Sequence, residues 1–268
     1  MSTAIPAYDG YIFDLDGTVY LGEALLPGAR QAIETLRAAG RRTVFLSNNP
    51  TRTSSEYAAK LTRLGLQTGP EDVVNSSQVM VRWLLREAPG SRVFVVGEQP
   101  LRDELVAAGF ELSERAGQID FVIASFDRTF EYRKLQIAFD AIRAGARFVA
   151  TNADRYCPVP GGGEPDAAAV IAAIEACTAT TVEVVVGKPS PIMAEAVAEL
   201  VRLPPERCLM VGDRLETDIA MGRAAGMATA LTLTGATTRE ALAKAELRPD
   251  YVVESLLELV GGQNGLRG

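Results

Sequence analysis

Two aspartates one residue apart, Asp14 and Asp16, directly follow the apolar run 11–13 and precede Gly17. Carboxylates this close repel each other, and burying either one costs desolvation energy unless a cation or a proton neutralises it. Because side chains alternate along a strand, both carboxylates can point into one crevice at its carboxyl end. A divalent metal ion is the natural partner for the pair. The alternative, a pair that only caps a turn, fits an isolated D-x-D better than the D-x-D-G-T found here.

Three further apolar runs, 43–46, 184–186 and 208–211, also end in polar residues. In chain order these residues are Ser47, Asn48 and Asn49, then Lys188, then Asp213. Taken singly, Ser47 could be a helix-entry residue and Lys188 a surface lysine. If the four strands are parallel neighbours, their carboxyl ends lie along one edge of a sheet and the polar clusters meet in one crevice.

The chemistry of this set is complementary, because it combines carboxylates for a hard cation, one fixed lysine and one hydroxyl. Such a set suits phosphoryl transfer, in which cations neutralise oxygen charge while a carboxylate attacks in line. Oxygen-only ligands favour Mg²⁺ as the metal.

Strand-length apolar runs alternate along the chain with helix-length stretches that often end at a glycine. The predicted helices cover residues 28–39, 53–64, 76–87, 101–108, 132–144, 166–177 and 191–203. This alternation predicts an α/β fold with a Rossmann-like, doubly wound, mainly parallel sheet. The loop 158–165, rich in proline and glycine, is either a slack connection or a lid that faces the substrate.

Composition excludes several classes of protein. The net charge of −7 argues against nucleic-acid and anionic-membrane partners, so we expect a small-molecule substrate. No apolar stretch is long enough for a bilayer span and no secretory signal is evident, so we expect a cytoplasmic protein. The chain has no histidine, which excludes histidine-based catalysis and leaves proton transfer to carboxylates, lysine, tyrosine or water.

Taken together, the motifs D-L-D-G-T, L-S-N-N, V-G-K-P-S-P and G-D-R-L-E-T-D resemble the haloacid dehalogenase superfamily of phosphohydrolases. The likeness extends over nearly the whole chain to the subgroup of the NagD and 4-nitrophenyl phosphatases, which carries a C2-type cap.

The resemblance implies a role for each matching residue. Asp14 would be the nucleophile that forms an aspartyl-phosphate, and Asp16 the acid that protonates the leaving oxygen and then activates water. The implied phosphate-binding set is Asp14, Leu15, Asp16, Ser47, Asn48, Asn49 and Lys188. Mg²⁺ would be held by Asp14, the backbone carbonyl of Asp16, and Asp213, with Thr18 and Asp218 in support.

The spacing of the motifs indicates which part of the sequence forms the cap domain. Residues 19–46 are too few for an inserted domain, whereas 140 residues separate Ser47 from Lys188. We therefore predict a catalytic core at 1–80 and 187–268 and a smaller α/β cap at 81–186. In relatives of this type the cap covers the substrate and often shares in dimer contacts, so a homodimer through the cap is expected.

Within the cap, the resemblance implies that Asn152, Asp154 and the loop up to Asp166 face the leaving group. Asp166 could bind a polyol hydroxyl or cap its helix, and capping is favoured. We therefore expect a Mg²⁺-dependent phosphatase acting on a small sugar or polyol phosphate. The alternatives are an aryl, pyridoxal or phosphoglycolate phosphatase and, from a different class, a non-catalytic phosphate sensor, which the presence of all four motifs disfavours.

Overall fold

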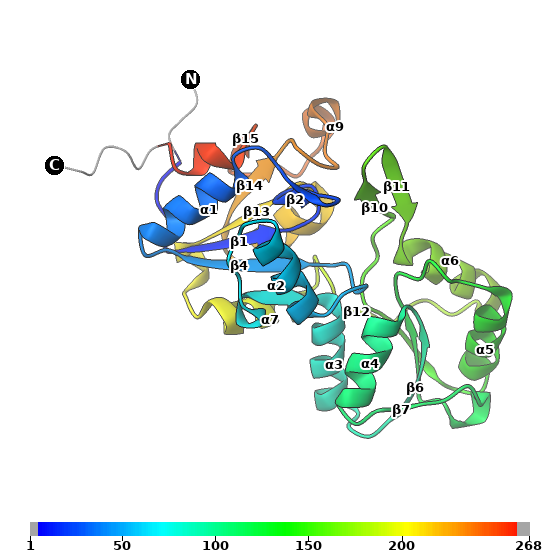
Figure 1. The fold of residues 1–268 in the computed structure, drawn as a ribbon. Helices are drawn as coiled ribbons and strands as arrows, with labels where there is room; N and C mark the ends of the chain where they lie inside the picture. Colours follow the sequence, from blue (N-terminus) through cyan, green and yellow to red (C-terminus); the bar gives the residue numbers. More distant parts are fainter. Residues whose placement is uncertain (1–4, 262–268) are drawn as a thin grey trace.

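The apolar run before Asp14 forms strand β1 (Gly10–Asp14), which lies inside a six-stranded parallel sheet in the computed structural model (Figure 1). The structure describes residues 5–261. The order of strands across this first sheet is β15 (Tyr251–Val253), β14 (Ala228–Thr232), β13 (Cys208–Gly212), β1, β4 (Arg42–Ser47) and β5 (Val73–Asn75). All of its strand pairs are parallel, which confirms the predicted doubly wound α/β sheet.

Alternating side chains of β1 enter two different hydrophobic layers, as the period of a strand requires. Tyr11 and Phe13 pack in the layer under α1 (Ala29–Ala38) and α2 (Ser54–Arg63). Ile12 packs in the opposite layer, under helices α3 (Ser76–Glu87), α7 (Pro191–Val201) and α8 (Ala220–Ala224). Because both faces are covered, the polar edge at the carboxyl ends of the strands is the open side of the sheet.

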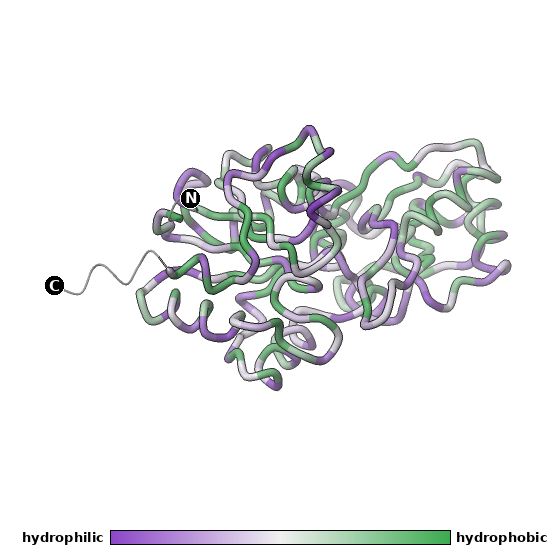
Figure 2. Tube along the Cα trace, turned by 90° about the horizontal axis from the view of Figure 1, so that it is seen from above, coloured by the Kyte–Doolittle hydropathy of each residue, from purple (hydrophilic) through white to green (hydrophobic). Residues whose placement is uncertain are grey.

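A second, smaller parallel sheet lies beside the first, so the molecule has two lobes of unequal size (Figure 2). Its strand order is β12 (Val184–Val185), β9 (Arg147–Ala150), β8 (Phe121–Ala124), β6 (Arg92–Val96) and β7 (Glu111–Leu112). Helix α4 (Gln99–Ala107) covers one face together with α3, and the other face packs against α5 (Tyr132–Arg143) and α6 (Ala167–Thr178). Every predicted helix from 28–39 to 191–203 is present, with its ends shifted by at most two residues.

The strand before Lys188 is not a neighbour of β1, which corrects the expectation that all four polar strand ends belong to one sheet. Its two residues, β12, pair with β9 of the second sheet in the register Val184↔Val149 and Val185↔Ala150. Lys188 therefore lies on the connection that returns from the second sheet to α7, and it reaches the edge of the first sheet from there.

The proline- and glycine-rich segment 158–165 is ordered as an antiparallel hairpin, β10 (Tyr156–Val159) and β11 (Gly162–Pro165). A smaller hairpin that sequence analysis also missed, β2 (Tyr20–Leu21) and β3 (Ala24–Leu25), follows the D-x-D motif. The two turns touch, because a Cβ at Gly22 would lie 2.9 Å from Cγ of Pro160. Neither hairpin has an apolar alternation long enough to predict a strand.

The remaining elements are short. A π-helical turn, Leu215–Ile219, precedes α8, and α9 (Arg239–Lys244) follows β14. Single 3₁₀ turns cover Pro70–Asp72, Ala116–Gln118, Pro205–Arg207 and Leu256–Leu259. Within 5–261 we find no helix with the length and hydropathy that a bilayer crossing requires. Residues 1–4 and 262–268, assigned above to the core, lie outside the described part of the chain.

Helix α3 joins the two lobes. The boundary expected between residues 80 and 81 falls inside this continuous helix. Its buried apolar side chains, among them Met80, Trp83 and Leu84, belong to one hydrophobic cluster with Ile12 of the first sheet and Val95 of the second. The two sheets therefore share part of one apolar core.

We expect Leu84→Ala to lower the free energy of unfolding by about 2–5 kcal/mol, because the fully buried side chain leaves a cavity in this shared cluster. The adjacent Leu85 is 45% exposed, so Leu85→Ala should change stability by only about 0.5 kcal/mol. Urea unfolding followed by circular dichroism measures both. A Leu84→Ala protein as stable as the Leu85→Ala control would contradict a shared core.

Candidate active site

Three carboxylates gather at the carboxyl edge of the first sheet. Asp14 ends β1, Asp213 follows β13, and Asp218 lies on the π-helical turn. All three are buried, and one oxygen from each lies within 4.8 Å of the others, an arrangement that could hold a metal ion. The carboxylate of Asp16 does not belong to this group.

Lys188 supplies the one ammonium group in contact with this cluster within the described chain. Its Nζ donates to Oδ1 of Asp14 at 2.5 Å and to Oδ1 of Asp218 at 2.6 Å. The lysine side chain is 3% exposed, so these two charge-assisted bonds form away from water. The lysine that the sequence placed at a strand end is thus a buried ion-pair partner and not a solvated surface residue.

The charges of the cluster do not balance. When all three carboxyl groups are ionised, the single ammonium group leaves an excess of two negative charges in a buried site. Burial raises the pKa of Asp14 well above its ordinary value; Lys188 opposes this rise, and the Asp218 and Asp213 carboxylates reinforce it. Burial and then Asp218 raise the pKa of Asp213 to about 7. A divalent cation would supply the missing charge and stabilise the ionised carboxylates.

Glycines let the chain approach these carboxylates closely. A Cβ at Gly17, where φ is +91°, would lie 2.6 Å from Oδ2 of Asp213, and one at Gly235 would lie 2.0 Å from it. A side chain at either position would collide with the carboxylate. The glycine of D-x-D-G-T is therefore required both by its backbone conformation and by this contact.

The segment Ser47–Asn49 follows β4 and is organised by its own side chains. The Oγ of Ser47 accepts from the backbone N–H of Asn49 at 3.1 Å and lies 3.4 Å from the hydroxyl of Tyr57. Asn48 contacts Lys188 twice, because its Oδ1 accepts from the lysine N–H at 2.7 Å and its Nδ2 donates to the lysine carbonyl at 3.2 Å. The residues after β4 thus position the backbone of the lysine as well as lining the site.

Asp16 lies beside the cluster in a different environment. It is half-buried, and the hydroxyl of Tyr20 donates to its Oδ2 at 3.2 Å. Burial raises the pKa of Asp16, although Lys60 and the Tyr20 hydroxyl oppose the rise. A carboxyl group with a raised pKa next to a nucleophile is suited to donate a proton.

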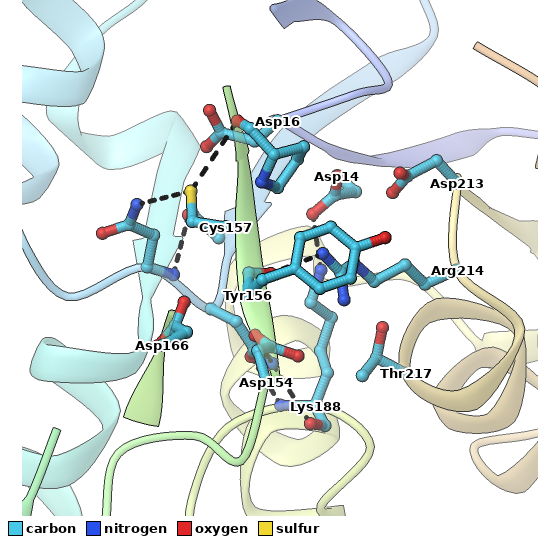
Figure 3. A pocket seen from close by; sticks show the side chains of 14 residues that line it. Asp14, Asp16, Asp154, Tyr156, Cys157, Asp166, Lys188, Asp213, Arg214 and Thr217 are labelled. Atoms are coloured by element: carbon cyan, nitrogen blue, oxygen red, sulfur yellow. Dashed lines mark hydrogen bonds and ion pairs between the residues drawn. The ribbon is translucent and has the colours of Figure 1, made fainter. Parts of the chain in front are cut away.

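A small cavity of about 40 Å³ opens among these groups (Figure 3), which leaves room for about three water molecules. The predicted residues that line it are Asp14, Asp16, Ser47, Asn48, Asn49, Asp154, Asp166, Lys188 and Asp213. The structure therefore brings together residues from both lobes that lie up to 199 positions apart, from Asp14 to Asp213. The cavity matches a phosphoryl-sized group more closely than a whole sugar phosphate.

Four predicted residues do not line the cavity. Leu15 and Thr18 are buried in the turn after β1, where the Leu15 carbonyl accepts from the N–H of Thr18 at 3.2 Å. Asp218 instead accepts the hydrogen bond from Nζ of Lys188 given above. Asn152, which was expected to face the leaving group, is fully buried and does not line the cavity.

Asn152 instead connects two carboxylates of the second lobe. Its Nδ2 donates to Asp154 at 3.2 Å and to Asp166 at 3.0 Å, and its Oδ1 accepts from Thr151. Asp166 caps α6 by accepting from the N–H of Ala167 at 2.5 Å, as the favoured alternative predicted. Asp154 also accepts from Nδ2 of Asn48 at 3.0 Å, so this network crosses between the lobes.

Sequence reasoning missed the cavity residues Tyr156, Cys157, Pro158, Arg214 and Thr217. The guanidinium of Arg214 donates to the carbonyl of Tyr156 at 2.7 Å and lies 4.8 Å from the centre of its ring. Asn49 lies 3.4 Å from the sulfur of Cys157. These contacts hold the β10–β11 hairpin in place at the wall of the cavity. The hints in the sequence were Arg214 and Thr217 inside the motif G-D-R-L-E-T-D, and Pro158 at the start of the loop 158–165.

Comparison with known proteins agrees with this geometry. A family model described as haloacid dehalogenase-like hydrolase matches residues 11–111, and one described as HAD-hydrolase-like matches residues 185–259. Sugar-phosphatase AraL of Bacillus subtilis is 41% identical over 253 residues, covering 93% of this chain and 91% of that protein.

Two solved structures are also similar. The crystal structure of 4-nitrophenylphosphatase from Thermotoga maritima has a TM-score of 0.89 and 38% identity, covering 94% of this chain and 96% of that one. Glycerol phosphate phosphatase from Mycobacterium tuberculosis in complex with magnesium has a TM-score of 0.85 and 35% identity, covering 94% and 76%.

The Asp166 carboxyl should make stability depend on pH. Burial and then Asp154 raise its pKa to about 7, compared with about 3.9 when unfolded. Between these values the folded protein holds a proton that the unfolded chain has lost, so stability falls as pH rises. Asp166→Asn keeps an acceptor for the N–H of Ala167 but cannot titrate. We expect it to reduce the fall in the free energy of unfolding by up to about 1.4 kcal/mol per pH unit.

Urea unfolding at pH 5 and pH 8 measures the effect for the unsubstituted protein and for Asp166→Asn. A matched change at an exposed aspartate, Asp140→Asn, should leave the pH dependence unaltered. If the free energy of unfolding changed equally between pH 5 and pH 8 for the unsubstituted protein and Asp166→Asn, the expected titration of Asp166 would be contradicted.

Proposed function

Since the chain belongs to the haloacid dehalogenase-like hydrolases, within the NagD and 4-nitrophenylphosphatase subgroup, and is a phosphatase, we propose the details of its reaction. It hydrolyses a small phosphorylated metabolite, a sugar or polyol phosphate, with the help of Mg²⁺. The phosphoryl group passes through an aspartyl-phosphate on Asp14.

One observation carries this proposal: a buried lysine lies between two carboxylates of a cluster that has two negative charges in excess. A purely structural cluster would be costly with that charge. A site that takes up a divalent cation gains the missing positive charge from that ion.

The donor set fits Mg²⁺, because every side-chain donor is a carboxylate oxygen. Asp14 and Asp213 would hold the ion together with the backbone carbonyl of Asp16, with Asp218 in support. When bound, the ion would neutralise charge on the phosphoryl oxygens. The related glycerol phosphate phosphatase crystallised with magnesium supports this choice.

In the first step, a carboxylate oxygen of Asp14 attacks phosphorus and the bond to the ester oxygen breaks. Asp16, whose raised pKa keeps a proton available, gives that proton to the leaving oxygen. Lys188 restrains the Asp14 carboxylate at 2.5 Å and, together with the Ser47 hydroxyl, binds phosphoryl oxygens as they become more negative.

In the second step, Asp16 is a carboxylate and accepts a proton from water. The water oxygen attacks phosphorus, the bond to Asp14 breaks, and inorganic phosphate leaves with Asp14 restored. The same carboxyl group therefore acts first as acid and then as base, which suits a chain that has no histidine.

The sugar or polyol class is supported by the polar lining of the cavity and by the similarity to sugar-phosphatase AraL. The alternative of an aryl phosphate is favoured by one feature, the ring of Tyr156 at the cavity. Both classes use the same chemistry at Asp14, so only the preferred leaving group differs.

We expect the protein to release phosphate from a panel of phosphomonoesters and Asp14→Asn to lower the rate by about 10⁴-fold or more, because the nucleophile is lost. The exposed Asp140→Asn variant is the matched control and should retain full activity. Phosphate release and the far-ultraviolet circular dichroism of each variant are measured together. Phosphate release that persists in a folded Asp14→Asn variant would contradict an aspartyl-phosphate on Asp14.

Chelation should abolish activity and Mg²⁺ should restore it. Because Asp213 is a proposed ligand, Asp213→Asn should raise the Mg²⁺ concentration needed for half-maximal activity by about tenfold or more. A magnesium titration of both proteins after treatment with EDTA tests this. Undiminished hydrolysis in EDTA would rule out the metal.

A further inference from the structure

Arg214 connects the carboxylate cluster to the β10–β11 hairpin (Figure 3). Its backbone is fixed at the cluster, because its N–H donates to Oδ2 of Asp218 at 3.0 Å and its carbonyl accepts from the N–H of Asp218 at 3.1 Å. Its side chain extends to the hairpin, where the guanidinium donates to the carbonyl of Tyr156 at 2.7 Å. One residue therefore contacts both the hairpin and the carboxylate that binds Lys188.

The guanidinium of Arg214 is charged and committed to the hairpin. Burial alone would lower the pKa of Arg214, but the carboxylates of Asp154, Asp213 and Asp14 raise it above its ordinary value. Within 5–261 the side chain forms no ion pair, and its partners are the carbonyl and the ring of Tyr156. A hydrogen bond from a charged donor is stronger than one between neutral groups, so this contact is well suited to hold the hairpin.

Two further contacts between the hairpin and the first lobe are weaker. The amide of Asn49 lies 3.4 Å from the sulfur of Cys157, and a thiol sulfur is a poor acceptor. The turns at Gly22 and Pro160 touch through carbon atoms only. If Arg214 were removed, the hairpin would lose its shortest polar contact among these three.

The hairpin forms a wall of the space that a leaving group would occupy. A second cavity, of about 190 Å³, shares Asp16, Asn49, Cys157 and Pro158 with the phosphoryl-sized cavity. In the proposed function Asp16 protonates the leaving oxygen, so the rest of the leaving group extends from Asp16 into this second cavity. The position of the hairpin therefore sets the width of the space around the leaving group.

We propose that Arg214 is a positioning residue that holds the β10–β11 hairpin against the leaving group of the substrate. Affinity for the whole ester then depends on this guanidinium, whereas the phosphoryl group is bound without it. The inference rests on the proposed function and adds a residue to it. Arginine suits the role, because a planar guanidinium can bind a carbonyl through its edge while it stacks on an aromatic ring.

Hydrolysis of glycerol 3-phosphate and inhibition by inorganic phosphate test the proposal together, since inorganic phosphate has no leaving group. We expect Arg214→Gln to raise KM for glycerol 3-phosphate by about tenfold, because a charged hydrogen bond is lost. Both kcat and the inhibition constant of phosphate should change by no more than about twofold. Saturating Mg²⁺ is used throughout, because Arg214 adjoins the proposed ligand Asp213.

A second measurement does not depend on hydrolysis. Arg155 is exposed and directly precedes β10, so trypsin can cleave after it when the hairpin detaches. Arg214→Gln should accelerate this cleavage by about tenfold, as followed by mass spectrometry of the fragments. Arg214→Lys keeps a charged donor but loses the planar stack, so its KM and cleavage rate should lie between those of the other two proteins.

Arg223→Gln is the matched control. The guanidinium of Arg223 also donates to one backbone carbonyl, that of Arg248, but it lies on α8 and lines neither cavity. This variant should leave KM, the inhibition constant of phosphate and cleavage after Arg155 unchanged.

The outcomes separate the two proposals. An unchanged KM in Arg214→Gln would overturn the inference while hydrolysis itself stood. A matching rise in the inhibition constant of phosphate would also overturn it, because Arg214 would then act on the phosphoryl group. If the unsubstituted protein hydrolysed no ester, the proposed function would fail, and the trypsin measurement would still show whether Arg214 holds the hairpin.

Discussion

The structure depends on the ion pairs that hold Lys188 between Asp14 and Asp218. These three side chains come from a strand of the first sheet, a π-helical turn and the connection that returns from the second sheet. Each would be costly to bury alone, because an unpaired charge loses its hydration. Together they fix the edge of the sheet, and with Asp213 they carry an excess of negative charge that a divalent cation would balance.

The second lobe takes part in this arrangement through neutral and charged side chains. Asn48 holds both the backbone of Lys188 and the carboxylate of Asp154, so the position of the lysine is coupled to the contact between the lobes. The fully buried amide of Asn152 then connects Asp154 to Asp166 at the start of α6. A polar network of this kind stabilises one particular placement of the second lobe, since every member loses a partner if it shifts.

The parts of this arrangement that could be predicted are those with a local signal. Asp14, Ser47 and Asp213 follow apolar strands of the first sheet, and the topology rule for parallel sheets places them at one edge. Lys188 reaches the same edge, but from the second sheet, because the pairing partner of a two-residue strand is decided by tertiary contacts. Asn152 lies next to a strand end as expected, yet its amide turns inward to satisfy two carboxylates. Tyr156 and Arg214 meet across the lobes, and no periodicity encodes such a contact.

Within residues 5–261 the strands β10 and β11 pair with each other and with no other strand, so they share no register with either parallel sheet. A change of sequence or length in its turn would leave both sheets and the buried lysine in place. The wall of the substrate space can therefore diverge independently of the machinery that breaks the phosphate ester. One scaffold can in this way give rise to several enzymes that catalyse the same reaction on different substrates. Exchange of this hairpin is therefore a direct way to change the substrate that such an enzyme accepts.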